Sequence, residues 1–207
     1  MDSLRVYGGV QGQDRRAERR AQLVEAGLDL LGAGGGERAL TVRGACKRAG
    51  LTARYFYESF RDREALELTV YDHVIDEIAS SALRAVGEAP RDARAMIRAG
   101  LGAIVRTVAD DPRKGRLLFS VALSSELLAE RRTRSSRLFA DLLGGQARDY
   151  YGLDATADLE PTAQFLVGGL AQTLTAWLDG ALALGAEELV ERCTGVFLAV
   201  GDVAQQP

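Results

Sequence analysis

Apolar side chains recur at helical spacing over most of this chain, and the pattern predicts helices rather than strands. Residues 42–49 show it most clearly, because Val42, Ala45, Cys46 and Ala49 fall at i, i+3, i+4 and i+7 on one helix face. No convincing run alternates apolar and polar residues in the manner of a half-buried strand. The sequence therefore predicts an all-α fold of about nine helices.

The breaks between apolar stretches set the expected helix limits. Residues 1–13 lack a pattern and predict a flexible arm, and the glycine-rich run at 32–36 predicts the end of a first helix. Pro112 follows another helix end, because proline cannot continue a helix and restricts the residue before it. Outside the segment 42–60, the expected helices cover residues 15–31, 61–86, 91–109, 114–118, 120–143, 159–184 and 186–203.

Two short helical patterns flank a tight corner at residues 49–51. Thr41 and Thr52 stand just before the two helices, where a hydroxyl can accept hydrogen bonds from the free amides of a first turn. Gly50 suits the corner because glycine takes a positive φ without a Cβ clash. Leu51, Phe56 and Phe60 can then fold inward, which predicts a helix-turn-helix with a basic and aromatic outer face.

This segment resembles the N-terminal signature of the TetR family of transcriptional regulators, from about residue 16 to residue 66. The resemblance rests on Thr-Val-Arg at 41–43, Ala-Gly-Leu-Thr at 49–52, Tyr-Phe-Tyr-Glu-Ser-Phe at 55–60 and Glu-Ala-Leu at 64–66. It implies a helix-turn-helix DNA-binding domain at 14–63 and a helical effector-binding and dimerisation domain at 64–207. Many members carry Gly in place of Arg54 and Lys in place of Arg63, so base preference does not transfer from them.

The start of a recognition helix points into the major groove, where an arginine can pair with two acceptors of one guanine. Ala53, Arg54 and Tyr55 are therefore the base-edge candidates, with Arg43 as a second position. Other polar residues are better placed for phosphates, and the resemblance implies that role for the positions of Thr41 and Tyr57. The complete candidate DNA-binding set is Thr41, Arg43, Lys47, Thr52, Ala53, Arg54, Tyr55, Tyr57 and Arg63.

The charge distribution agrees with this assignment. Residues 1–63 carry 12 Arg or Lys against 8 Asp or Glu, a net of +4, whereas residues 64–207 carry 14 against 21, a net of −7. A basic module on an acidic body is expected where one end meets phosphates. Two interpretations stay open for the arginines at 15, 16, 19 and 20: a solvated helix end, or a contact with phosphates or a minor groove.

The last two expected helices are apolar over more than one stripe and contain several glycines. Glycine in a helix interior costs up to about 1 kcal/mol relative to alanine, so close helix–helix approach is a compensating reason. We therefore expect a four-helix homodimer bundle, as the resemblance also implies; the alternative is an Ala- and Gly-rich surface. Cys46 and Cys193 lie far apart, and no apolar run reaches the roughly 20 residues of a membrane span, which predicts a soluble cytoplasmic protein without disulfides.

A mostly apolar effector cavity between body helices is implied by the resemblance. The candidate lining residues are His73, Met96, Phe119, Phe139, Phe165 and Trp177, with Tyr150 beside them, although such residues at helical spacing also form ordinary core. No nucleophile–base pair or metal-ligand cluster stands out, so neither an enzyme nor a cofactor or metal site is expected.

These features together predict a ligand-responsive regulator, a homodimeric repressor that leaves a pseudo-palindromic operator when a small-molecule effector binds. The alternative is a small-molecule-binding or protein-interaction helical protein with a non-regulatory helix-turn-helix. The +4 charge of residues 1–63 favours the regulator.

Overall fold

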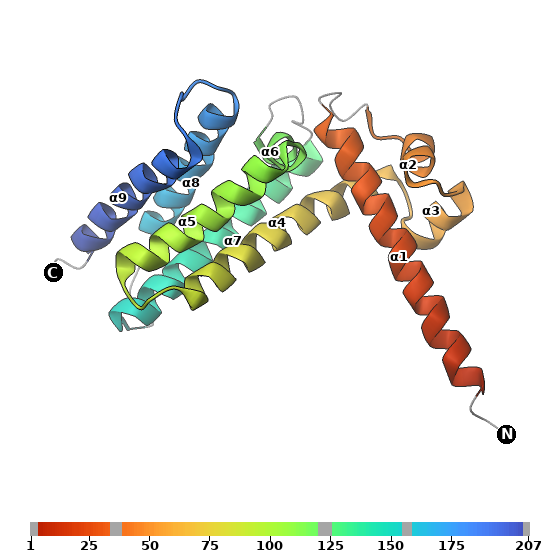
Figure 1. Cartoon of the computed structure of the whole chain (residues 1–207), viewed down its shortest axis with the longest axis horizontal. Coiled ribbons are helices and arrows are strands. Elements are labelled where there is room, and N and C mark those ends of the chain that lie inside the picture. Colours follow the sequence, from red (N-terminus) through yellow and green to blue (C-terminus); the bar gives the residue numbers. More distant parts are fainter. Residues whose placement is uncertain (1–3, 34–38, 120–125, 155–158, 205–207) are drawn as a thin grey trace.

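The chain is helical throughout its described part. The computed structural model describes residues 4–33, 39–119, 126–154 and 159–204, and it contains no strand there. The helices are α1 (Leu4–Gly32), α2 (Val42–Ala49), α3 (Ala53–Ser59), α4 (Arg63–Glu88), α5 (Ala93–Asp110), α6 (Pro112–Phe119), α7 (Glu126–Tyr151), α8 (Glu160–Leu178) and α9 (Ala186–Ala204) (Figure 1). The all-α prediction with about nine helices is confirmed. None of these helices is both long and apolar enough to cross a membrane.

Helix α2 begins and ends at the residues that the local signals predicted, whereas the capping signal before α3 fails. The Thr41 hydroxyl accepts a hydrogen bond from the Gly44 amide at 3.0 Å, and Gly50 follows α2 with a φ of 68°. Asp62 caps α4 by accepting from the Ala65 amide at 2.7 Å. Thr52 precedes α3 but makes no side-chain capping hydrogen bond, so the predicted cap is wrong there.

Three helix limits differ from the prediction by more than two residues. Helix α1 already begins at Leu4, so the segment from residue 4 to 13 is helical and not the arm expected, while residues 1–3 lie outside the described part. Helix α7 continues through Gly144 and Gly145 and ends only before Gly152, whose φ is 65°. The expected start of that helix, residues 120–125, is also outside the described part. Helix α8 ends at Leu178, because Gly180 adopts a φ of 77°.

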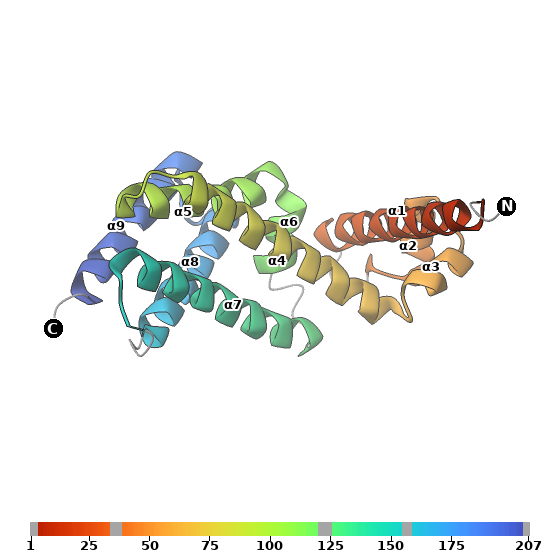
Figure 2. The same ribbon diagram turned by 90° about the horizontal axis from the view of Figure 1, so that it is seen from below.

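The molecule is elongated, with α1–α3 at one end, α8 and α9 at the other, and α4 running between them (Figures 1 and 2). A first core includes Leu23, Phe56 and Val70 from α1, α3 and α4 and extends to Leu117 in α6. A second core joins α5, α8 and α9 around Leu101. The domain boundary expected between residues 63 and 64 falls in the first turn of α4, whereas the first core continues across it.

Helix α1 meets the body at the N-terminal end of α6. The Arg113 guanidinium there bonds Asp29 of α1, the Glu25 carboxylate at 2.7 Å and the Asp111 carboxylate at 2.7 Å. Arg48 of α2 binds Asp29 at 2.5 Å from the other side, and the hydrogen bonds from Arg48 and Arg113 lower the pKa of Asp29. This ion-pair chain therefore connects α1 and α2 with the first turn of α6.

The α1–α6 contact leaves no room for a side chain at Gly32. A Cβ atom built on this buried residue would lie 2.7 Å from the Arg113 Cα atom, which is backbone and cannot rotate away. We expect Gly32→Ala to force α1 and α6 apart and to destabilise the protein by about 1–3 kcal/mol in urea unfolding. Gly12→Ala is the matched control, because Gly12 lies in the same helix with nothing within 4 Å. There, alanine should leave stability unchanged or raise it, and equal losses in both variants would contradict the steric explanation.

Candidate nucleic-acid interface and internal cavity

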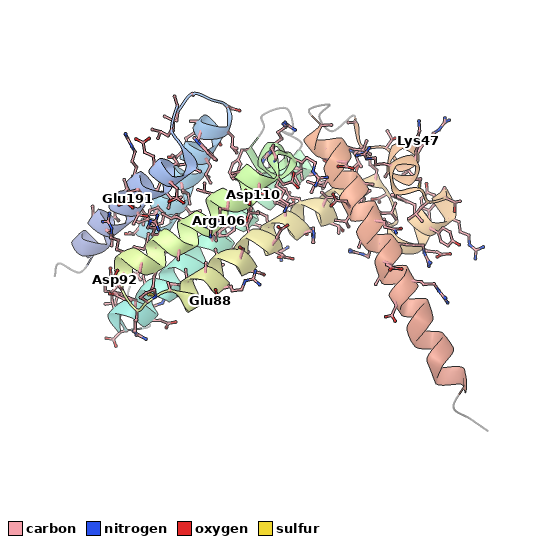
Figure 3. The ribbon with its side chains drawn as sticks, viewed as in Figure 1. Lys47, Glu88, Asp92, Arg106, Asp110 and Glu191 are labelled. Atoms are coloured by element: carbon pink, nitrogen blue, oxygen red, sulfur yellow. The ribbon has the colours of Figure 1, made fainter. Side chains whose placement is uncertain are left out.

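Helices α2 and α3 form the predicted helix-turn-helix at one end of the molecule. Its inner side is buried, with Phe56 fully enclosed and Phe60 only 4% exposed, and the two rings pack 5.7 Å apart. Its outer side carries the predicted basic and aromatic residues, among them Tyr57 at 61% exposure. Figure 3 shows Lys47 projecting from α2 away from the rest of the molecule. The burial of the two phenylalanines thus fixes which side chains face outward.

Most of the candidate DNA-binding residues are exposed. The Arg54 side chain is 84% exposed and pairs with Glu58, one turn later, at 3.2 Å. The candidates exposed with Arg54 on α2, α3 and their flanks are Thr41, Arg43, Lys47, Thr52, Ala53, Tyr55 and Tyr57. Eight of the nine candidates are therefore exposed on or beside α2 and α3, and their DNA contacts stay a prediction.

Arg63 is the exception. Its guanidinium lies 2.9 Å from the carboxylate of Glu67, a residue that is only 1% exposed. Removing a partner from a buried charge is costly, so Arg63 has a structural task in the first turn of α4. Arg63 is a DNA-binding candidate by its position in the motif, where the burial of the acid one turn later is not apparent.

The arginines at 16, 19 and 20, in the middle of α1, lie against α3. Arg16 bonds the main-chain oxygen of Glu58, and the Arg19 guanidinium lies 3.7 Å from its carboxylate and 4.5 Å from the centre of the Tyr55 ring. Arg20 lies 5.0 Å from the Phe60 ring centre. Sequence reasoning missed Glu58, which holds arginines from two helices on one side of the module. The only signal for it was an acidic residue within a basic segment.

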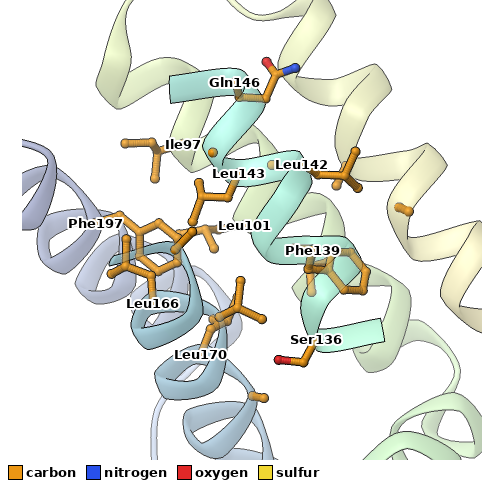
Figure 4. Close-up of a pocket in the computed structure, with 18 of the residues that line it drawn as sticks. Ile97, Leu101, Ser136, Phe139, Leu142, Leu143, Gln146, Leu166, Leu170 and Phe197 are labelled. Atoms are coloured by element: carbon orange, nitrogen blue, oxygen red, sulfur yellow. The ribbon is translucent and has the colours of Figure 1, made fainter. Parts of the chain in front are cut away.

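A cavity of about 640 Å³ lies in the body, between α4, α5, α7 and α8 (Figure 4). Aliphatic and aromatic side chains form most of its wall, including Ile97, Leu101, Phe139, Leu166 and Phe197. A volume of this size is typical of a site for a small molecule. The structure therefore contains the kind of space that an effector needs.

Several sequence-predicted effector residues lie on this wall and others do not. Met96, Phe119, Phe139 and Tyr150 line the cavity. His73 is exposed on α4, and Phe165 is 73% exposed on α8. Trp177 packs against both cores and donates its indole hydrogen to the Leu184 oxygen at 2.8 Å. These last three were expected to line the cavity, and the structure places none of them there.

Polar groups on the cavity wall were missed by sequence reasoning. The Tyr71 hydroxyl lies 3.0 Å from the Ser135 hydroxyl, and burial raises the pKa of this phenol, so Tyr71 is neutral. Arg132 stands one turn before Ser136 on α7, and its Nε donates to the Leu118 oxygen at 3.2 Å. Within the described residues, no group of three or more His, Cys, Asp or Glu is arranged to hold a metal ion.

Comparison with known proteins gives fold-level relatives. The sequence matches no protein-family model, and no curated protein matches it. Among solved structures, a TetR-family regulator from Marinobacter aquaeolei VT8 is 22% identical with a TM-score of 0.64, covering 91% of this chain and 97% of that one. A TetR-family regulator from Streptomyces coelicolor is 19% identical with a TM-score of 0.70, covering 91% and 82%. This chain has the TetR-family fold.

A third neighbour with this fold was solved with a ligand. The transcriptional regulator FadR from Bacillus subtilis, in complex with stearoyl-CoA, has a TM-score of 0.72 at 14% identity, covering 87% of this chain and 98% of that one. In the TetR-family fold of this chain, the helix-turn-helix and the cavity are both in contact with α4. Leu66 and Val70 near its start belong to the first core with α1, and later residues from Tyr71 to Val86 line the cavity.

Proposed function

We propose that this chain is a ligand-responsive, DNA-binding transcriptional regulator that acts in the cytoplasm as a homodimeric repressor. The observation that carries the proposal is the position of α4. One continuous helix contacts the module with the exposed basic and aromatic face and also forms a wall of the cavity. A ligand that fits one position of α4 better than another would shift the population of module positions.

The proposed homodimer uses the outer faces of α8 and α9. On α8, Phe165, Gly168, Gly169 and Gln172 are exposed at i, i+3, i+4 and i+7, and α9 exposes Gly195 and the half-exposed Val196 at the same end of the molecule. A Cβ atom added at Gly169 or Gly195 would meet nothing within 4 Å, so packing within one chain gives no reason for a glycine there. Close approach of a second copy of the chain does give a reason for these glycines.

In the proposed DNA complex, base edges are contacted by Ala53, Arg54, Tyr55 and Arg43. Phosphates are contacted by Thr41, Lys47 and Tyr57. In a dimer, two such modules read two half-sites of a pseudo-palindrome. The effector-binding and dimerisation region is 64–207, although the core shared by α1–α4 mechanically joins it to the module.

The experiment that tests this proposal is fluorescence anisotropy of the pure protein on DNA from upstream of its own gene, beside a scrambled duplex, at several salt concentrations. Preferential binding with a steep negative salt slope is the expected result. If both duplexes bind equally weakly, genome-wide selection of bound fragments with protein refolded free of ligand follows. A protein that selects no fragment is not a DNA-binding regulator.

Arg54→Ala is expected to relax the operator's base preference. A bidentate arginine–guanine contact gives about 1–3 kcal/mol of discrimination, so replacing Arg54 should equalise binding to operators that differ at one base pair of each half-site. Binding to a panel of single-substitution operators measures this. Tyr57→Phe, which removes a proposed phosphate contact, should instead weaken all operators to a similar degree.

Arg61→Ala is a matched control for Arg54, since the Arg61 side chain is 80% exposed and also pairs with a neighbouring carboxylate, Asp62, at 3.0 Å. It lies after α3, outside the proposed reading surface. An unchanged base preference in Arg54→Ala, or the same change in Arg61→Ala, would contradict the reading role.

A further inference from the structure

The cavity is long, because its lining residues follow several helices from end to end. On α4 they run from Tyr71 to Val86, which at about 1.5 Å per residue is a distance of about 22 Å. Along α8 they run from Leu159, the residue just before this helix, to Thr175, about 24 Å by the same rise. Contacts near the two ends fix the direction: Tyr71 of α4 meets Ser135 of α7, and the Ala93 amide at the start of α5 meets Tyr150 at the end of α7.

The length and volume fit one extended hydrocarbon chain. A carbon–carbon bond of about 1.5 Å at an angle of about 111° advances about 1.25 Å along a zigzag, so 22 Å holds about 17 carbons. At about 30 Å³ for each water-sized group, 640 Å³ holds roughly 20 such groups. The number of carbons from the length and the number of groups from the volume agree, whereas a compact fused-ring ligand would leave much of the length empty.

The charge on the wall is confined to one end. Among the described lining residues, Arg132 is the only one with a charged side chain. The hydroxyl of Ser136 stands one turn further along α7. At the opposite end, the Tyr150 hydroxyl already accepts from the Ala93 amide at 3.1 Å, and Leu153 and Leu159 are apolar. The cavity thus has a cationic end and an uncharged end.

We propose that this cavity binds a single-chain aliphatic monoanion of about 12–18 carbons, with its anionic head group at Arg132 and its tail towards Tyr150 and Leu153. The inference deepens the proposed function, on which it rests, by giving the chemical class of the effector. A carboxylate is the simplest such head group, and it can be paired by the Arg132 guanidinium in a site partly removed from water.

The test is a titration by calorimetry of protein refolded free of ligand, with no DNA present. Saturated fatty acids from 8 to 20 carbons form one series, each below its aggregation concentration, and the matching primary alcohols form a second. Each added methylene should lower the Kd about fourfold, from about 0.8 kcal/mol per buried methylene, until the chain fills the cavity at about 16–18 carbons. Carboxylates should bind about 10- to 100-fold more tightly than alcohols of equal length.

Arg132→Gln should abolish this preference for the carboxylate while leaving alcohol affinity nearly unchanged. Arg131→Gln is the matched control, because Arg131 is the preceding residue, pairs with Asp72 at 2.8 Å and does not line the cavity. Alcohol binding also reports that the Arg132 variant is folded.

Three outcomes would overturn the proposal: no dependence on chain length, a carboxylate preference that survives Arg132→Gln, or a fused-ring sterol that binds more tightly than every chain. A further arm uses acyl-CoA thioesters, which lack a free carboxylate. Tighter binding of thioesters by both wild type and Arg132→Gln would overturn the head-group assignment. Because DNA binding is measured separately, a protein that binds DNA but no chain loses only this inference, and one that binds chains but no DNA loses only the regulatory function.

Discussion

A Phe165→Glu variant is expected to be monomeric and to bind a palindromic operator roughly 1000-fold more weakly than the wild type. Phe165 is 73% exposed on α8, on the face that we propose for the homodimer. In a twofold interface the substitution occurs twice and places two carboxylates where an apolar surface meets its copy. Loss of the second module also removes the avidity of two linked half-site contacts, a factor of about 10²–10⁴.

Light scattering gives the oligomeric state, and anisotropy on full and half operators gives the affinities. Leu138→Glu is the matched control, because Leu138 is an exposed leucine (38%) on α7, outside the α8 and α9 faces. It should stay dimeric and bind the full operator normally. A Phe165→Glu protein that remains dimeric at micromolar concentration would show that the interface lies elsewhere.

The helix-turn-helix could be predicted because its determinants are close in sequence. Thr41 caps its helix through an amide that is only three residues away, and Gly50 needs only its own backbone conformation to end that helix. The alternation of Phe56 and Phe60 with exposed neighbours follows from one helical turn. Each of these signals acts within a few residues, so the printed sequence contains it in full.

The errors concern residues whose partners are distant in sequence. Gly144 resembles a helix stop locally, yet it lies inside α7 on the cavity wall, where an added Cβ atom would lie 4.0 Å from the Leu159 Cβ atom. The sequence predicts Arg19 near a helix start, but it lies in the middle of α1, beside Glu58 and Tyr55 of α3. Periodicity marks these residues as helical and does not say which face meets which neighbour.

The cavity could not be separated from ordinary core by pattern alone. Met96 and Trp177 are both half-buried members of apolar helix faces, but only Met96 borders the empty space, and Trp177 is held between the two cores. Whether a cavity is present depends on how completely the side chains of several helices fill the space between them. Arg132 illustrates the same limit, since one arginine among several on α7 becomes informative only when the other described lining residues are known to be uncharged.

Filling the middle of this cavity is expected to separate ligand response from DNA binding. Ala79 of α4 is 9% exposed and lines the cavity about midway between Tyr71 and Val86. In Ala79→Trp, an indole would occupy the space through which an extended ligand must pass. We expect ligand affinity to fall at least 100-fold, since more than four methylenes, at about 0.8 kcal/mol each, would lose their place. Operator affinity should stay within about twofold of the wild type.

Ser80→Trp provides the control, because Ser80 is the next residue on α4 and is exposed outside the cavity. It adds the same side chain to the same helix without filling the space. If only Ala79→Trp stays bound to the operator at ligand concentrations that dissociate the wild type from it, the cavity is the site through which the ligand acts. If both variants respond normally, the effector binds elsewhere and α4 is not its route to the helix-turn-helix. If Ala79→Trp instead dissociates from the operator when no ligand is present, the indole itself acts as an effector, because it shifts α4 in the way that an occupied cavity would.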